Sequence, residues 1–185
     1  MKCTGIQSQL LLGTVLVALF ESSLLFAEVF KTRDDALATA FEGAGTVLRK
    51  TVFLTDEQVS QIESLAKVAV ESKIVTYYIG MKSDSAIGFA FFETNVVRTK
   101  SETFLVVVRP DGSVQKTEML AFYEPMDYMP TSNWFTLFRN RVLSDGLWPK
   151  REIHNVTGAT LTVRAVTQGV RKILATFDVA VRKER

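Results

Sequence analysis

An apolar stripe near the C-terminus constrains the fold most, because it predicts a long amphipathic helix that begins at or near Thr160. Hydrophobic residues recur there at steps of three and four, which places them on one face of a 3.6-residue helix. These residues are Val163, Val166, Val170, Ile173, Leu174 and Phe177. The residues predicted to lie off that face are Arg164, Gln168, Arg171 and Lys172. Arg171 and Lys172 also lie toward the C-terminal end, where positive charge suits the helix dipole.

The rest of the chain predicts strands and further helices in a pattern typical of an α+β domain. Apolar runs bounded by turn residues predict strands at 47–54, 74–79, 87–98, 104–109 and 114–123. Helices are predicted at 33–41, after the capping box Thr55–Gln58, and at 133–142. Pro110-Asp111-Gly112 predicts the turn of a hairpin. For 185 residues, of which 47% are hydrophobic, we expect one domain in which helices pack on an antiparallel sheet.

The N-terminal segment has the features of a secretory signal peptide. Lys2 supplies a positive charge, and the apolar run Leu10–Phe20 is short for a bilayer span. Ala27 offers a small residue at the predicted cleavage position. We therefore expect residues 1–27 to direct export and to be removed, which leaves residues 28–185 in the periplasm or elsewhere outside the cytoplasm. The alternative is that the segment is kept as a membrane anchor.

Composition excludes several classes of protein. Lys and Arg total 22 against 20 Asp and Glu, and no basic block indicates nucleic-acid binding. Cys3 is the only cysteine and lies in the predicted signal peptide, so the mature domain has no thiolates for haem attachment or for an iron–sulfur cluster. His154 is the only histidine, which excludes a histidine-based zinc site. We therefore expect no metal site.

The residues just before the C-terminal helix form the strongest candidate site. In Thr157-Gly158-Ala159-Thr160 a hydroxyl residue follows Gly-Ala at a predicted helix start. Backbone N–H groups converge at such a position, and the helix dipole adds partial positive charge, so it can seat a phosphate. Thr is also a common N-cap residue, and a run of small residues before a helix often binds nothing. The tetrapeptide alone leaves both interpretations open.

Two segments together resemble the FMN-binding domain family. Thr157–Thr162 fits the family pattern [ST]-G-A-[ST]-x-[ST]. Glu124–Pro130, followed by Trp134 and Phe138, is similar to the family segment E-P-x-D-Y-x-P…W…F. The family includes the FMN-carrying subunits of the Rnf and Nqr respiratory complexes. The resemblance covers most of residues 45–177 and implies a bacterial protein with FMN as its redox group.

By position, the resemblance implies that a flavin transferase joins the FMN phosphate to Thr160 through a phosphoester. Gly158 and Ala159 lack the bulk that would keep the phosphate and the ribityl chain from the backbone. The residues expected to hold the cofactor on this segment are Thr157, Gly158, Ala159, Thr160, Leu161 and Thr162. His154 departs from the family pattern, which has an acidic residue at that position.

The second segment supplies candidates for contact with the flavin ring. Tyr123, Tyr128, Met129 and Trp134 are expected to form an apolar shelf, because aromatic faces stack on planar rings. Ordinary core packing is the alternative for each of them. Glu124 is expected either to hydrogen-bond the ribityl chain or ring edge, or to accept bonds from backbone N–H groups in the loop before Pro125.

The sequence therefore predicts an exported electron-transfer carrier with one FMN at Thr160 and no substrate pocket of its own. Its expected partners are redox proteins, including membrane-bound ones, and the flavin transferase that loads it. No general acid with a clear partner stands out, which favours a carrier over an enzyme. Two alternatives remain: a small flavin-dependent reductase of an exported substrate, and a flavin-free structural or binding protein of the same fold.

Overall fold

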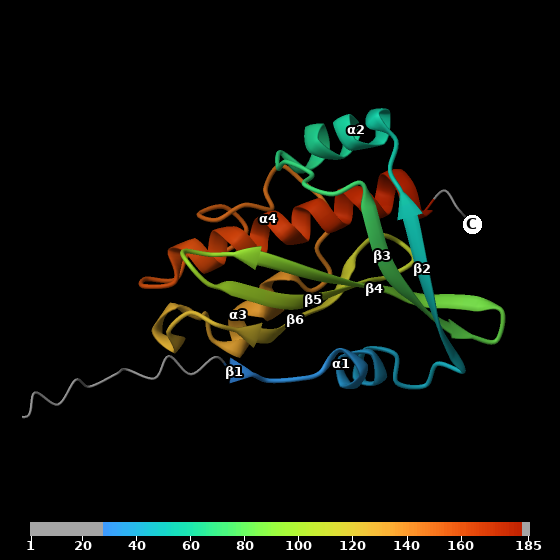
Figure 1. Ribbon diagram of the computed structural model, residues 1–185, viewed down its shortest axis with the longest axis horizontal. Helices are drawn as coiled ribbons and strands as arrows, with labels where there is room; N and C mark the ends of the chain where they lie inside the picture. Colours follow the sequence, from blue (N-terminus) through green and yellow to red (C-terminus); the bar gives the residue numbers. More distant parts are fainter. Residues whose placement is uncertain (1–27, 183–185) are drawn as a thin grey trace, which may run out of the picture.

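A computed structural model describes residues 28–182, so the predicted signal peptide lies outside the described residues. The centre of the molecule is a six-stranded antiparallel sheet with the strand order β1-β6-β5-β4-β3-β2 (Figure 1). The strands are β1 (Glu28–Val29), β2 (Thr46–Phe53), β3 (Ile74–Lys82), β4 (Ser85–Val96), β5 (Ser101–Val108) and β6 (Val114–Phe122). From β3 to β6 each strand pairs with the next one along the chain, as short turns between antiparallel strands require.

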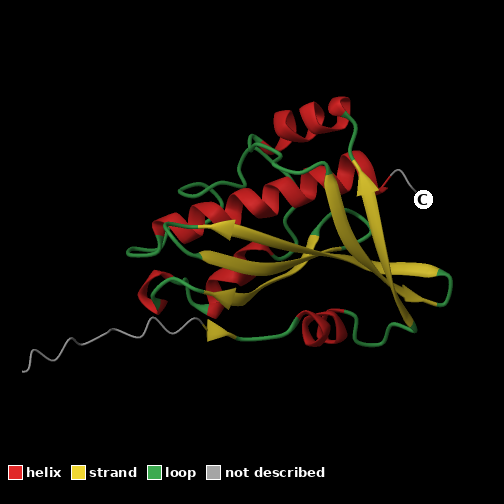
Figure 2. Ribbon diagram, viewed as in Figure 1, coloured by secondary structure: helices red, strands yellow, loops and turns green. Residues whose placement is uncertain are grey.

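Helices cover both faces of the sheet (Figures 1 and 2). They are α1 (Arg33–Ala40), α2 (Asp56–Ala66), α3 (Ser132–Phe135) and α4 (Thr160–Thr176), with the 3-10 turns η1 (Met126–Tyr128) and η2 (Thr136–Phe138) and the π-helical end η3 (Phe177–Val181). α4 lies across one face against β4 and β5 with α2 packed on it, whereas α1 lies on the opposite face. The predicted α+β domain with a C-terminal helix beginning at Thr160 is confirmed. Among the helices of the described chain, none combines the length and hydropathy that a membrane crossing requires.

The apolar stripe of α4 forms the centre of the larger core. None of its six predicted residues is more than 4% exposed, and they pack with Phe91 and Phe104 from the sheet. Fully burying such a side chain stabilises a protein by about 1.5–3 kcal/mol. A smaller core on the opposite face joins Leu37 and Phe41 of the α1 segment to Leu105 of β5. The larger core therefore fixes where the N-terminal end of α4 lies on the sheet.

The helix predicted over residues 133–142 is wrong beyond Phe138. Helical structure ends with η2, and Asn140 adopts a left-handed backbone conformation with a φ of 63°. The Asn140 N–H donates to the Val114 carbonyl over 2.8 Å, and the Val114 N–H donates to the Arg141 carbonyl over 2.8 Å. The helix ends here because Asn140 and Arg141 hydrogen-bond to Val114 at the outer edge of β6.

Arg171 is buried, although the sequence places it off the apolar face of α4. Its Nε donates to the Ala66 carbonyl over 2.8 Å, and its Nη2 donates to the Leu65 carbonyl over 3.2 Å, at the C-terminal end of α2. Its Nη1 donates to the carbonyls of Ser144, over 2.5 Å, and Leu147, over 3.3 Å. Burial lowers the pKa of this guanidinium, but the last carbonyls of a helix are natural acceptors for a cation. Arg171 thereby ties α4 to α2 and to the loop that follows η2.

A buried carboxyl, Glu102, lies beneath α4. It pairs across the sheet with Asn95, whose Nδ2 donates to the Ala165 carbonyl over 3.1 Å, so both side chains face α4. Glu102 is fully buried, and neither of its carboxyl oxygens has a hydrogen-bond partner among residues 28–182. Burial raises the pKa of Glu102 to about 8, so the side chain is protonated at neutral pH.

Candidate functional site

A tight turn leads into α4 and exposes its first residues. Gly158 has a φ of 86°, a conformation that strains residues with a side chain. The Ala159 N–H donates to the Val156 carbonyl over 3.1 Å, and the Val163 N–H donates to the Ala159 carbonyl over 2.9 Å. Ala159 is therefore the N-cap, and Thr160 is the first residue of the helix, in agreement with the prediction that the helix begins at or near Thr160.

No side chain caps the N-terminal end of α4. Ala159 has no side-chain acceptor, and no acidic residue lies in the first turn. Thr160 is exposed, and its Oγ1 accepts a hydrogen bond from Nδ2 of Asn155 over 3.2 Å. The Thr160 hydroxyl in turn donates to the Val156 carbonyl over 3.5 Å. A fixed hydroxyl beside N–H groups that the helix itself cannot satisfy is suited to a phosphate.

The turn η1 packs directly against this end of α4. Oγ1 of the buried Thr162 donates to the Tyr128 carbonyl over 2.7 Å. A Cβ added at Gly158 would lie 3.5 Å from the Asp127 carbonyl. Tyr128 is half-buried, and the guanidinium carbon of Arg98 lies 4.5 Å from the centroid of its ring. The two segments that the sequence singled out therefore meet at the start of α4.

Glu124 closes the turn between β4 and β5. It is 4% exposed, and its Oε1 accepts bonds from the backbone N–H groups of Arg98 (3.2 Å), Thr99 (2.8 Å) and Lys100 (2.9 Å). These bonds, above all the one from Thr99, hold the pKa of Glu124 below its ordinary value. Glu124 thus accepts hydrogen bonds from backbone N–H groups, but these belong to the turn between β4 and β5 and not to the loop before Pro125. The same turn contains Arg98, which lies over the Tyr128 ring.

Trp134 positions the loop that leads into the Thr157–Thr162 motif. It is 5% exposed, and its Nε1 donates to the His154 carbonyl over 2.7 Å. Its ring makes edge-to-face contacts with Phe135 and Phe138, with centroids 5.1 Å and 5.2 Å away. The His154 side chain is exposed. In this structure Trp134 therefore packs in the core and positions the backbone at His154.

The candidate residues lie in an exposed group and a buried group. The exposed or half-buried residues are Thr157, Gly158, Thr160, Leu161, Tyr123, Tyr128 and Met129. The buried residues are Ala159, Thr162, Glu124 and Trp134. Sequence reasoning missed Asn155 and Arg98, because Asn155 lies just outside the motif pattern and Arg98 is distant from it in the sequence. Within residues 28–182, no group of three or more His, Cys, Asp or Glu side chains could hold a metal ion.

Comparison with protein families gives a clear assignment. A model of the FMN-binding domain matches residues 72–175, from the segment before β3 into the last turn of α4. The matched region includes η1, Trp134 and the whole Thr157–Thr162 motif. A comparison with curated proteins finds no match. The family match covers more than half of the 185 residues and agrees with the resemblance seen in the sequence, so the chain belongs to the FMN-binding domain family.

Proposed function

We propose that this protein is an exported electron-transfer carrier that holds one FMN through a phosphoester to Thr160. Membership of the FMN-binding domain family supports FMN as the cofactor. The observation that carries the attachment point is the exposed Thr160 hydroxyl at a helix N-terminus without a side-chain cap. Export through residues 1–27 belongs to the same proposal and rests on the signal-like sequence.

The first turn of α4 fits the phosphate of a diester. Its N–H groups would donate to the phosphate oxygens, and the helix dipole would offset the remaining negative charge. Gly158 adds no side chain in front of these groups, and Ala159 buries its methyl, since it is 1% exposed. The Asn155 amide holds the oxygen of Thr160 with a hydrogen bond. These residues leave space for a phosphate and fix the atom that would bind it.

Attachment requires a donor in which the phosphate of FMN is activated, and we propose a flavin dinucleotide presented by the flavin transferase. The Thr160 oxygen would form a bond to the flavin-side phosphorus as the pyrophosphate bond breaks. A nucleoside monophosphate would leave, and the hydroxyl proton would pass to the transferase or to water. Because Thr160 is exposed, a second protein can reach it.

The residues proposed to contact the flavin ring are Tyr128 and Leu161, because both adjoin the first turn of α4 and neither is fully buried. Leu161 is 45% exposed, so its apolar surface is accessible next to Thr160. Arg98 lies over Tyr128 and adds positive charge there, which favours uptake of an electron nearby. A bound FMN supplies reversible transfer of one or two electrons. An exposed site of this kind suits exchange with redox partner proteins, including membrane-bound ones.

Protein purified from its own host should keep its flavin absorbance after denaturation and desalting. Because a phosphoester survives unfolding, the intact mass should exceed that of the polypeptide by one ester-linked FMN. The same mass spectrum should show a chain that starts at or near Glu28 if residues 1–27 are removed. A colourless protein of unmodified mass, from a host with an active transferase, would contradict the proposal. Turnover of a small substrate with an artificial electron donor would instead support the reductase alternative.

Replacing Trp134 by Phe should reduce flavin loading although Thr160 is untouched. The change removes the donor to the His154 carbonyl and part of the core, which should cost about 2 kcal/mol of stability. Urea unfolding and the flavin-modified fraction by intact mass would measure the two effects. Phe138→Leu is the matched control, because it disturbs the same cluster but keeps the indole bond. Equal loading in both variants would show that the bond to His154 does not position the motif.

A further inference from the structure

A cavity of about 520 Å³ opens at the outer edge of β6, apart from the attachment site. It is walled by α1 on one side, by β6 itself, and by α3 with η2 on the other side. Its apolar wall includes Phe30, Met119, Met129 and Phe135. None of the residues from Thr157 to Thr162 contributes to it. Its volume lies in the range of small-molecule sites.

The cavity exists because the outer edge of β6 is paired only at its two ends. At one end β1 pairs with Ala121 and Phe122, and the N–H groups of Phe30 and Lys31 donate to the Leu120 carbonyl. At the other end Val114 bonds to the loop after η2. Between Val114 and Leu120, no strand of the described chain pairs with the outer side of β6. The free edge of this middle stretch therefore borders the cavity, and Gln115 to Met119 contribute to its wall.

Thr117 contributes to the cavity wall, but its Oγ1 is shielded from solvent and makes no hydrogen bond within residues 28–182. This hydroxyl is therefore not available to a bound molecule. The apolar side chains of the wall point to a ligand that is mostly apolar.

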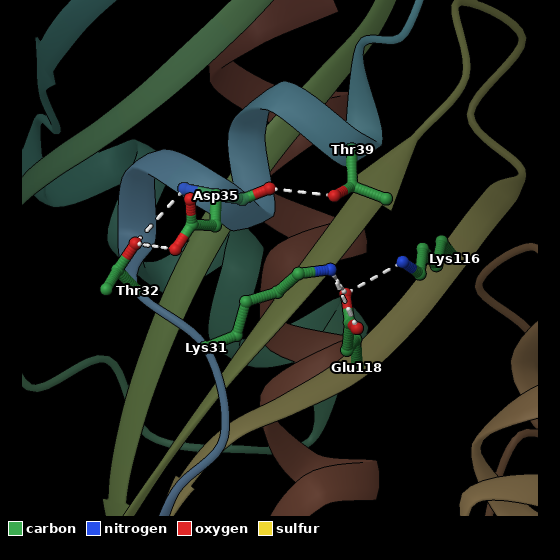
Figure 3. A network of polar contacts seen from close by, with 6 residues as sticks. All are labelled: Lys31, Thr32, Asp35, Thr39, Lys116 and Glu118. Carbon is green, nitrogen blue, oxygen red and sulfur yellow. Dashed lines mark hydrogen bonds and ion pairs between the residues drawn. The ribbon is translucent and has the colours of Figure 1, made fainter.

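Positive charge exceeds negative charge at the mouth of the cavity. Figure 3 shows Lys31 and Lys116 meeting at Glu118, with Nζ–O distances of 3.2 Å and 2.7 Å, and Thr39 on α1 beside them. Burial would raise the pKa of Glu118, but hydrogen bonds from the two lysines outweigh it and lower this pKa, so the carboxylate is ionised. Arg139 also lines the cavity, and no carboxylate of the described chain pairs with it.

We propose that this cavity binds an amphipathic anion, a small molecule with an apolar body and one carboxylate or sulfonate group. The aromatic and methionine side chains would take the apolar body. Arg139 and Lys116 line the cavity together with a single carboxylate, Glu118, which is ion-paired to Lys116, so Arg139 is left to hold the anionic group at the mouth. None of the motif residues Thr157–Thr162 lines the cavity, although Met129, which adjoins the proposed flavin contact Tyr128, does. The proposed ligand is therefore one that binds without the ester at Thr160.

The probe for the test is anilinonaphthalene sulfonate, an aromatic sulfonate that fluoresces strongly in apolar surroundings. The purified full-length protein should bind one probe molecule, measured by fluorescence titration and calorimetry. Thr39→Trp fills the mouth from an exposed position on α1 and should weaken binding at least about tenfold. Arg139→Gln should weaken it about fivefold. The matched controls Thr51→Trp and Arg49→Gln change exposed residues of β2 and should bind as the wild type does.

Competition with known molecules distinguishes a ligand with an alkyl body from a ligand with an aromatic body. Laurate displacing the probe would assign an alkyl body, and naphthoate displacing it would assign an aromatic one. Dodecanol and naphthol, which lack the charge, should displace it at least about fivefold less well. Equal displacement by the uncharged molecules, or wild-type affinity in both Thr39→Trp and Arg139→Gln, would overturn the proposal. Displacement of the probe by free FMN would also overturn it, because it would show that the cavity is part of the flavin site.

Discussion

A Thr160→Ala variant should carry no covalent flavin, while it remains folded and exported. The change removes the only oxygen that can form the proposed ester at the first position of α4. The structural cost should be small, within about 0.5 kcal/mol, because Thr160 is exposed and Ala is a good helix former. Ala159, not Thr160, occupies the N-cap, so no side-chain cap is lost. Denaturing electrophoresis under ultraviolet light and peptide mass mapping, with the transferase co-expressed, would measure the adduct.

Neighbouring hydroxyls provide the controls for this result. Thr160→Ser keeps an oxygen at the same position and should retain part of the loading. Thr157→Ala changes an exposed hydroxyl three residues earlier and should leave the attachment point unchanged. Flavin that stays attached in Thr160→Ala would refute the assignment. If the wild type itself is unmodified, His154→Asp tests whether the missing acidic residue prevents loading.

The wild type should become less stable as pH rises, and in a Glu102→Gln variant this pH dependence should be much weaker. The folded pKa of Glu102 is about 8, against an ordinary value of 4.5, because the carboxyl is buried. Below about pH 4.5 the folded and unfolded chains both hold the proton. From there to about pH 8 the unfolded chain releases it while the folded chain keeps it, so the free energy of unfolding falls with rising pH. By linkage the loss is on the order of 5 kcal/mol over this interval.

Urea unfolding at pH 5, 7 and 8.5 would measure this dependence. Gln cannot ionise, so the variant should become more stable than the wild type at the highest pH. Glu42→Gln is the matched control, because Glu42 is an exposed carboxyl of the same size and its loss should leave the slope unchanged. Parallel pH profiles for the wild type and Glu102→Gln would show that the buried carboxyl is not the titrating group.

Local patterns in the sequence predicted most of the fold because local chemistry decides those elements. The capping box at Thr55–Gln58 forms both of its hydrogen bonds, over 2.9 Å and 3.2 Å, and the stripe of α4 is buried as its spacing predicts. The failures depend on distant partners. The predicted helix at 133–142 ends early because Asn140 bonds to β6, and Arg171 is buried because its acceptors come from α2 and a loop. Spacing within one helix contains no information about either.

The candidate site shows the same division. The turn at Gly158 and the helix start at Thr160 follow from residue types within four positions, so the sequence located them. The packing of η1 on that turn and the bond from Trp134 to His154 join segments that are distant in the sequence, so they depend on how the chain folds back. The sequence therefore identifies the proposed attachment motif, whereas the distant residues that hold it in place are seen only in the three-dimensional structure.

The hydrogen bonds of Arg171 bear on where an independently folding fragment of this chain can begin. The family match begins at residue 72, after α2 has ended, so the matched region alone suggests a minimal domain without that helix. Yet Arg171 lies inside the matched region and gives two of its hydrogen bonds to the last carbonyls of α2. A fragment that started at residue 72 would lose these two bonds and would expose the part of the core that Ile62 and Ala66 cover, which is destabilising. We therefore expect an independently folding fragment to need α2, and the strand β2 that leads into it.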